Sequence, residues 1–339
     1  MKGSEEPADD RDARPYARPS AEDLELAILG EDPVYSASEV AERTGVTLEQ
    51  ASRLWRALGF PDRGLEVAFT ASDAEAVSTL VSQVDGGLID FDMAVTLTRA
   101  VGQTMARLAD WEVATLVHRV QEIEGGDEAT GSRARAGLHL IEHMNEPFER
   151  LLVYVWRRHL AAAVARVEAL GANDADLRSV PMTVGFADIV GFTELTNELT
   201  QSRIGDMVEL FESRCADVVA GQRGRVIKTL GDAVLFVNDD PIRAYDTAEG
   251  IITVVGRDSR MPDVRVGLAS GSVVMRLGDV FGPPVNLASR LTGVARRNRV
   301  IVDQATADLL PPDQFEARRL PARPVRGFGL LEPVAVRRH

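Results

Sequence analysis

The chain has 339 residues, of which 45% are hydrophobic and 27% charged, and its formal net charge is −14. This composition is typical of a globular protein with room for two domains, and it excludes disordered and fibrous proteins. The acidic balance opposes non-specific binding to nucleic acid or to an anionic membrane surface, so neither is expected as a partner.

No segment predicts a membrane span or a secretory signal. The best candidate span, residues 151–170, is interrupted by Arg157, Arg158 and Arg166, whose charges are costly in hydrocarbon. The N-terminus lacks a positively charged region that leads into an apolar one. The single cysteine, Cys215, excludes an intramolecular disulfide framework and is expected to be a buried thiol. We therefore expect a cytoplasmic protein.

The chain divides into four predicted regions. Residues 1–20 carry acidic residues and prolines with almost no large apolar side chains, which predicts a flexible arm. From residue 21 to 170, apolar positions recur every three or four residues, which predicts an all-helical domain. Gly and Asn break this pattern, so a linker is expected at 171–178. Strands and helices then alternate through 179–339, which predicts an α+β domain with helices over a mostly antiparallel sheet.

Within the helical region, residues 35–60 resemble a helix-turn-helix of the winged kind. Gly45 fits the turn, and Thr47 is placed to cap the second helix. A DNA-reading helix would present several basic residues, yet only Arg53 and Arg56 are available. We interpret the segment as a helical packing unit, with a DNA reader as the alternative.

The elements of the C-terminal region can be placed from alternation and periodicity. Hydrophobic and β-branched runs predict strands, and apolar spacing of three and four predicts helices. The expected elements are a strand at 182–187, a helix at 192–220, a hairpin at 226–237, a helix at 241–255, a strand at 264–275, a helix at 285–295 and a strand at 300–302, followed by short strands.

Two carboxylates mark the first chemical feature. Asp188 ends a buried strand and Asp232 lies at a Gly-Asp hairpin tip, so two turns would bring them together. Such a pair is costly unless a cation neutralises it, and hard oxygen ligands select Mg²⁺ or Mn²⁺. Two metals held against a triphosphate would lower the pKa of a sugar hydroxyl and stabilise a leaving pyrophosphate. The alternative is that Asp188 caps a helix and Asp232 forms a turn.

A phosphate-binding segment follows directly. Gly191, Phe192 and Thr193 lead into the next helix, whose first N–H groups favour phosphate oxygens. Gly191 allows close approach of the backbone to a ligand. This segment is expected to contact the substrate.

The motifs of residues 179–337 resemble, in their order, the catalytic domain of class III nucleotidyl cyclases. They are Phe186–Thr193, Lys228–Asp232, Asp279–Gly282, Asn286–Arg290 and Val325–Gly329. The resemblance implies a ferredoxin-like, palm-type antiparallel sheet and an adenylate cyclase that converts ATP to 3′,5′-cyclic AMP and pyrophosphate. It also implies two Mg²⁺ or Mn²⁺ ions per site, held by Asp188, Asp232 and the backbone carbonyl of Ile189.

The same resemblance assigns the purine-reading pair to Lys228 and Asp279. A cation can donate to adenine N1 while a carboxylate accepts from the N6 amino group, whereas guanine O6 would clash with that carboxylate. Guanylyl-type members resemble this pattern with a Glu and a Cys at the two positions. The pair therefore favours ATP over GTP, and a guanylyl cyclase is kept as an alternative.

Three further residues match positions that act on ribose and phosphate. Asn286 and Arg290 match the transition-state pair of the family, and their spacing of four puts both on one helix face. Arg326 lies where many members carry a triphosphate-binding Lys. The substitution keeps the positive charge but replaces a compact ammonium with a planar guanidinium. Because sites in this family are shared between subunits, one copy of the complete set implies a head-to-tail homodimer.

The helical half resembles the regulatory domain of actinobacterial cyclases that respond to acidic pH. Four of the five histidines, His118, His139, His143 and His159, lie there, and imidazole changes charge nearest neutral pH. His139 and His143 could share a helix face as metal ligands, although a metal site needs a further ligand. Richness in Leu, Val and Ala also allows a fatty acid or another apolar ligand. A DNA-binding regulator with a catalytically silent nucleotide-sensing domain is a further alternative for the whole chain.

Overall fold

The computed structural model describes residues 19–64, 66–127, 129–169, 179–276, 278–325 and 327–339. The chain divides into two compact units, Met1–Ala162 and Ala163–His339. Most of the predicted arm and the whole predicted linker at 171–178 lie outside the described residues, so both stay predictions.

The regular elements of the first unit are helices in the part that is described, apart from an isolated β-bridge between Tyr35 and Phe69. Its helices are α1 (Ala21–Leu29), α2 (Ala37–Thr44), α3 (Leu48–Leu58), α4 (Ala71–Asp85), α5 (Phe91–Gly125) and α6 (Arg133–Ala169), the last of which continues into the second unit. Side chains that cap α1 to α4 accept from the backbone of the first turn, and the residue three positions later bonds back to the cap. Among the described residues, no helix combines the length and the apolar character that a membrane crossing needs.

The helix-turn-helix-like segment is part of the core of this unit. Gly45 ends α2 with a positive φ of 73°, and Thr47 caps α3. Leu54 and Trp55 of α3 are buried in a cluster with residues of α2, α4 and α5. Arg53 donates to Asp92 at 2.9 Å, so this cation is already engaged within the protein. These contacts favour the packing interpretation.

The second unit is an α+β domain, as predicted. Its strands are β1 (Val180–Ile189), β2 (Arg225–Thr229), β3 (Ala233–Asn238), β4 (Val264–Arg276), β5 (Asp279–Phe281), β6 (Val300–Val302), β7 (Phe315–Arg319), β8 (Arg323–Val325), β9 (Gly329–Leu331) and β10 (Val334–Arg338). Its other helices are α7 (Phe192–Glu198), α8 (Gln201–Gly221), α9 (Pro241–Gly256), α10 (Pro283–Val294) and α11 (Gln304–Leu309).

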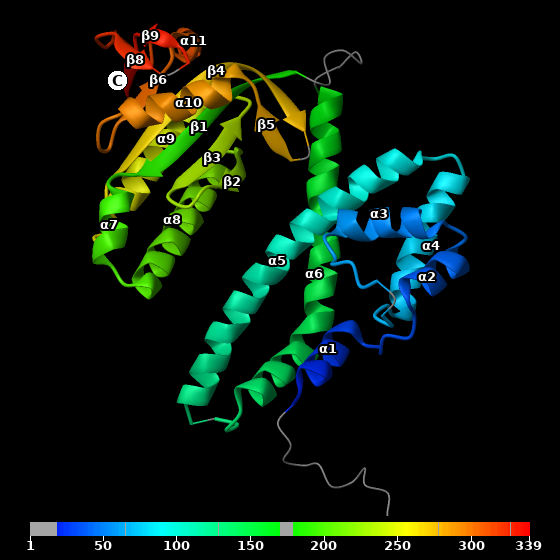
Figure 1. Cartoon of the computed structure of the whole chain (residues 1–339). Coiled ribbons are helices and arrows are strands. Elements are labelled where there is room, and N and C mark those ends of the chain that lie inside the picture. Colours follow the sequence, from blue (N-terminus) through cyan, green and yellow to red (C-terminus); the bar gives the residue numbers. More distant parts are fainter. Residues whose placement is uncertain (1–18, 65, 128, 170–178, 277, 326) are drawn as a thin grey trace, which may run out of the picture. The chain divides into compact units, whose positions relative to one another are not determined.

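The main sheet has the strand order β2-β3-β1-β4-β6-β10-β7, and β5 pairs with β4. Its neighbours are antiparallel except β4 and β6, which run parallel. Helices α8 and α9 pack on one face, and α10 packs on the other (Figure 1). Strands β8 and β9 form a separate pair.

Alternation along β1 explains how the sheet carries a core on each face. Val184 and Phe186 join the cluster that includes α10, whereas Ala187 and Ile189 join the cluster of α8 and α9. Because side chains alternate along a strand, Asp188 shares the α10 face with Phe186. A Cβ at Gly185 would lie 2.2 Å from the ring of Phe236, so a larger residue cannot occupy that position without repacking.

The predicted helix at 192–220 is wrong in one respect, because it is two helices. The chain is extended at Leu199, and Thr200 then caps α8 by accepting from the backbone N–H of Arg203. A capping hydroxyl at this position competes with continuation of the helix. Cys215 of α8 is fully buried as expected, and burial raises the pKa of its thiol, which keeps the sulfur protonated at neutral pH.

Candidate active site

The structure brings Asp188 and Asp232 to the same end of the sheet. Asp188 lies at the C-terminal end of β1 and is in register with Ala233, the residue after Asp232. The backbone N–H of Ile189 donates to the carbonyl oxygen of Asp232 at 3.0 Å. Burial raises the pKa of Asp188, and the negative charge of Asp232 adds to this effect. The two carboxylates therefore interact electrostatically.

Arg265 of β4 is a residue of this site that the sequence analysis missed. Its guanidinium contacts Oδ2 of Asp188 at 2.7 Å from Nε and 2.6 Å from Nη2. This contact lowers the pKa of Asp188, although burial outweighs it. Asp188 and Arg265 are opposite each other in the register of β1 and β4, which only the folded sheet reveals.

The donor set at this end of the sheet suits a hard divalent cation. Asp188 and Asp232 offer carboxylate oxygens, and the adjoining backbone of Ile189 offers a carbonyl oxygen. The guanidinium of Arg265 shows that a positive group can be seated against the partly buried oxygen of Asp188. The residues present therefore fit Mg²⁺ or Mn²⁺.

Lys228 and Asp279 are brought together although they are 51 positions apart. Lys228 follows an irregularity in the pairing of β2 with β3, and Asp279 begins β5. The Lys228 Nζ lies 2.5 Å from Asp279 Oδ2, and both side chains are about one third exposed, at 34% and 29%. The pair is therefore complementary in charge and open enough to meet a ligand.

Helix α10 presents Asn286 and Arg290 on one exposed face. Ala288 and Leu291 of the same helix are buried against the sheet. Within the described part of the chain, no hydrogen bond or ion pair joins Asn286 or Arg290 to the acidic pair or to Lys228 and Asp279.

The segment predicted to bind phosphate begins at a left-handed glycine. Gly191 has a φ of 73° and precedes α7, so Phe192 and Thr193 form the first turn of that helix. No side chain caps this helix start, so no capping side chain accepts from its first N–H groups. Arg326 lies outside the described residues, between Val325 at the end of β8 and Gly327, so its role stays a prediction.

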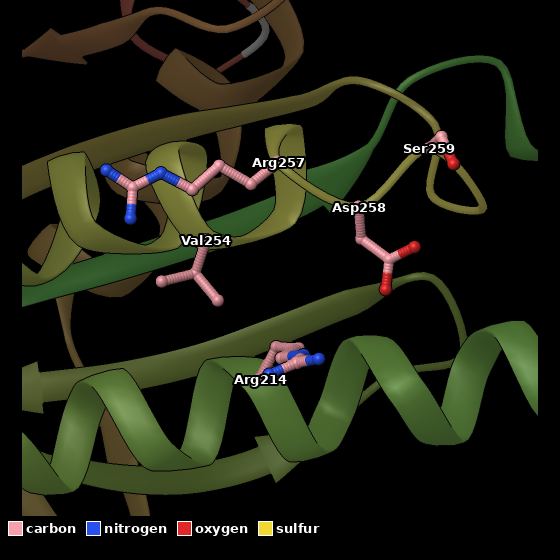
Figure 2. A pocket seen from close by; sticks show the side chains of 5 residues that line it. All are labelled: Arg214, Val254, Arg257, Asp258 and Ser259. Carbon is pink, nitrogen blue, oxygen red and sulfur yellow. The ribbon is translucent and has the colours of Figure 1, made fainter.

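A shallow depression of about 450 Å³ lies elsewhere in the second unit. It is lined by Arg214 of α8, Val254 of α9 and the residues Arg257, Asp258 and Ser259 that follow α9 (Figure 2). Hydrogen bonds from Arg260 hold the pKa of Asp258 at about 2. No residue of the candidate site lines this depression, so we assign it no part in catalysis.

Comparisons with known proteins show the family to which the chain is similar. Residues 177–336 match the family described as the adenylate and guanylate cyclase catalytic domain. An adenylate cyclase from Streptomyces coelicolor is 39% identical over 97% of this chain and 92% of its own, and one from Streptomyces griseus is 42% identical over 88% and 74%. A protein of Mycobacterium tuberculosis named as a pH-sensitive adenylate cyclase is 32% identical over 89% and 77%.

The sheet, the acidic pair and the family match together define a nucleotidyl cyclase catalytic domain. Because the similarity to the Streptomyces enzymes spans nearly the whole chain, it includes the helical region as well. The chain belongs to the class III adenylate cyclases, with a helical region N-terminal to the catalytic domain.

Proposed function

We propose that the protein converts ATP to 3′,5′-cyclic AMP and pyrophosphate in a homodimer with shared sites. The observation that carries this proposal is the convergence of Asp188 and Asp232 beside the carbonyl of Ile189. In the reaction, the ribose 3′-oxygen bonds to the α-phosphorus, the bond from that phosphorus to the bridging oxygen breaks, and the hydroxyl proton passes to solvent. Two Mg²⁺ or Mn²⁺ ions, when bound, supply acidification of the hydroxyl and charge neutralisation of the pyrophosphate.

The residues of this chain hold and orient the reactants. Asp188, Asp232 and the Ile189 carbonyl are the proposed metal ligands, and the backbone of residues 191–193 donates to phosphate oxygens. Asn286 positions the ribose. Arg290 of the same helix, together with Arg326, neutralises charge on the phosphates as the leaving group departs.

Substrate choice is proposed to rest on Lys228 and Asp279. The two side chains bond to each other, so each must exchange this contact for one to the purine when ATP enters. Lys228 donates to adenine N1, and Asp279 accepts from the N6 amino group. Guanine would place its O6 acceptor against the carboxylate, which leaves two acceptors facing each other.

Asp279→Asn is expected to relax this choice. An amide can turn its NH₂ toward guanine O6. The ratio of kcat/KM for ATP to that for GTP should therefore fall by about tenfold to hundredfold, which corresponds to the free energy of one hydrogen bond to a charged group. The measurement is kcat/KM for both nucleotides. Asp246→Asn, which removes an equally part-exposed carboxylate paired with Arg338, is the matched control and should keep the wild-type ratio. An unchanged ratio in Asp279→Asn would contradict the assignment.

The proposed homodimer is supported by the exposure of two sets of groups. Asn286 and Arg290 face outward from α10, where they can reach a nucleotide held by a second chain. Large apolar side chains are also exposed on the long helices, including Trp111 at 65%, Tyr154 at 61% and Trp156 at 61%. Apolar surface of this kind is typical of protein interfaces. A two-fold dimer would create two equivalent shared sites.

The proposed activity is tested by turnover of the purified full chain. ATP and GTP are compared with Mg²⁺ and with Mn²⁺, and cyclic nucleotide and pyrophosphate are measured together. We expect equal amounts of cyclic AMP and pyrophosphate from ATP, with GTP a poor substrate. Dominant cyclic GMP formation would instead support the guanylyl cyclase alternative. If neither cyclic nucleotide forms, the proposed activity is contradicted and the alternative of a regulator with a catalytically silent nucleotide-sensing domain is favoured.

We further propose that acidification activates the enzyme through its helical unit. The mycobacterial relative is named a pH-sensitive adenylate cyclase, which supports a response to pH. His118 Nδ1 lies 3.5 Å from Glu122, which also accepts from Arg119. Protonation of exposed histidines reduces the net negative charge of two associating chains, which lowers their repulsion.

The pH profile of cyclic AMP formation tests this regulation. Activity of the full chain is expected to rise as the pH falls from neutral toward 6, where imidazoles gain a proton. A fragment lacking residues 1–170 should show a flatter profile, since it retains the catalytic groups without these histidines. Identical profiles for the two proteins would rule out a pH response mediated by the helical unit.

A further inference from the structure

Helix α6 carries a second group of potential metal ligands, in the helical unit rather than in the catalytic one. His139, Glu142 and His143 each offer one ligand atom, and these atoms all lie within 4.8 Å of one another. Spacings of three and four place the three side chains on one face of the helix. A metal site at His139 and His143 needs a further ligand, and Glu142 is placed to supply it.

The ring of His143 is held in an orientation that suits metal binding. Its Nδ1 lies 2.7 Å from the backbone carbonyl oxygen of His139, so Nδ1 carries the proton and donates it there. This contact leaves the Nε2 lone pair for a metal. Ligating histidines in metalloproteins use the same arrangement, with one ring nitrogen bonded to a carbonyl and the other to the metal.

The three groups are accessible from solvent, since all three residues are exposed. In the described part of the chain, no hydrogen bond or ion pair engages the carboxylate of Glu142. The two imidazole rings lie with their centroids 4.2 Å apart, so their nitrogens can converge by rotation of exposed side chains.

We propose that His139, Glu142 and His143 bind one divalent transition metal ion, with Zn²⁺ the best match. Two imidazoles and a carboxylate, with a water in the fourth position, form a known donor set for Zn²⁺. Metal–ligand distances of about 2.0–2.2 Å in a tetrahedron require ligand atoms about 3.4 Å apart. The three ligand atoms already lie within 4.8 Å of one another, so small side-chain rotations can bring them to this separation. Mg²⁺ prefers an all-oxygen shell and does not compete here.

The site lies one turn before an intrinsic weak point of α6. Pro147 lies inside the helix and has no N–H, so the carbonyl of His143 lacks its usual partner four residues on. A metal that joins residues 139, 142 and 143 braces the turn that leads into this proline. Binding should therefore stabilise the helix N-terminal to Pro147, in addition to occupying the three side chains.

Zn²⁺ binding by the chelator-treated full chain tests the proposal, with millimolar Mg²⁺ present to occupy the oxygen ligands of the catalytic unit. Titration calorimetry gives stoichiometry and affinity, and Co²⁺ gives a visible absorption spectrum that reports nitrogen ligation. The wild-type chain is expected to bind one Zn²⁺. His139→Asn and His143→Asn should each weaken this binding by about tenfold or more. Loss of a residue that only supports a metal ligand already lowers metal affinity by about tenfold, and loss of the ligand itself should lower it at least as much.

Variants at equally exposed positions provide the controls. His118→Asn and His159→Asn each remove one imidazole outside the cluster and should bind Zn²⁺ as the wild type does, while Glu142→Gln should bind it more weakly. Circular dichroism establishes that each variant is folded. Wild-type affinity in the His139→Asn/His143→Asn double variant, or no saturable Zn²⁺ binding by the wild-type chain, would overturn the site. Unchanged affinity in Glu142→Gln would overturn the three-ligand assignment.

Discussion

Asp188→Asn is expected to abolish cyclic AMP formation while leaving the fold at least as stable. The amide has the size of the carboxylate but lacks the charge that holds a divalent cation. Loss of several kcal/mol of charge stabilisation in the transition state corresponds to a fall in kcat/KM of about a thousandfold or more.

The stability part of this prediction follows from the pKa of Asp188, which burial raises above its usual value. A carboxylate with a raised pKa contributes most to stability when protonated, and this contribution is lost as the pH rises from the unfolded pKa through the folded one. At neutral pH, ionised Asp188 therefore costs stability. Neutral Asn removes this cost, although it also weakens the contact with Arg265.

Activity and thermal unfolding at neutral pH test both parts. Asp258→Asn is the matched control, since Asp258 also pairs with an arginine but has a lowered pKa of about 2. That variant should keep its activity and should not gain stability at neutral pH. Substantial cyclic AMP formation by Asp188→Asn would contradict the proposed metal ligand, and a strongly lowered melting temperature would show that Asp188 serves the fold.

Arg290→Ala is expected to lower kcat by about a hundredfold to a thousandfold with little change in the KM for ATP. Arg290 is proposed to act on charge that develops as pyrophosphate leaves, and removal of one such donor has an effect of this size. The side chain is exposed on α10, so its loss should not disturb the core. Arg290→Lys should recover part of kcat, because it restores the charge without the planar fork.

Steady-state kinetics with ATP separate kcat from KM and so test this role. Arg297→Ala removes another exposed arginine shortly after α10 and should behave as the wild type does. A rise in KM at unchanged kcat would assign Arg290 to ground-state binding. Unchanged values for both constants would exclude it from the site.

Some of the candidate site could be predicted because its signals are local. A nearly continuous run of buried residues along β1 places Asp188 near a strand end, and the Gly-Asp pair marks the hairpin that carries Asp232. Spacing of four puts Asn286 and Arg290 on one face of α10. Lys228 and Asp279 were linked only by resemblance to a family, since no local rule pairs residues 51 positions apart.

Other features of the fold and of the site depend on tertiary arrangement or on a single residue in the sequence. Arg265 contacts Asp188 across 77 positions through the register of β1 and β4, which no short pattern specifies. The break between α7 and α8 was readable, because Thr200 is a capping residue, but the apolar periodicity outweighed it. Glu142 could also be predicted as a third ligand beside His139 and His143, since it lies three positions after His139 on the same helix.

The most direct test of a site shared between two chains is mixing an Asp188→Ala chain with an Asn286→Ala chain. Each variant alone should be inactive, because every site in its dimer lacks one essential group. Random assortment of equal amounts makes half of the dimers heterodimers with one intact site each, so about one quarter of wild-type activity should return. If a mixture with demonstrated heterodimers stays as inactive as its parents, the shared site is contradicted.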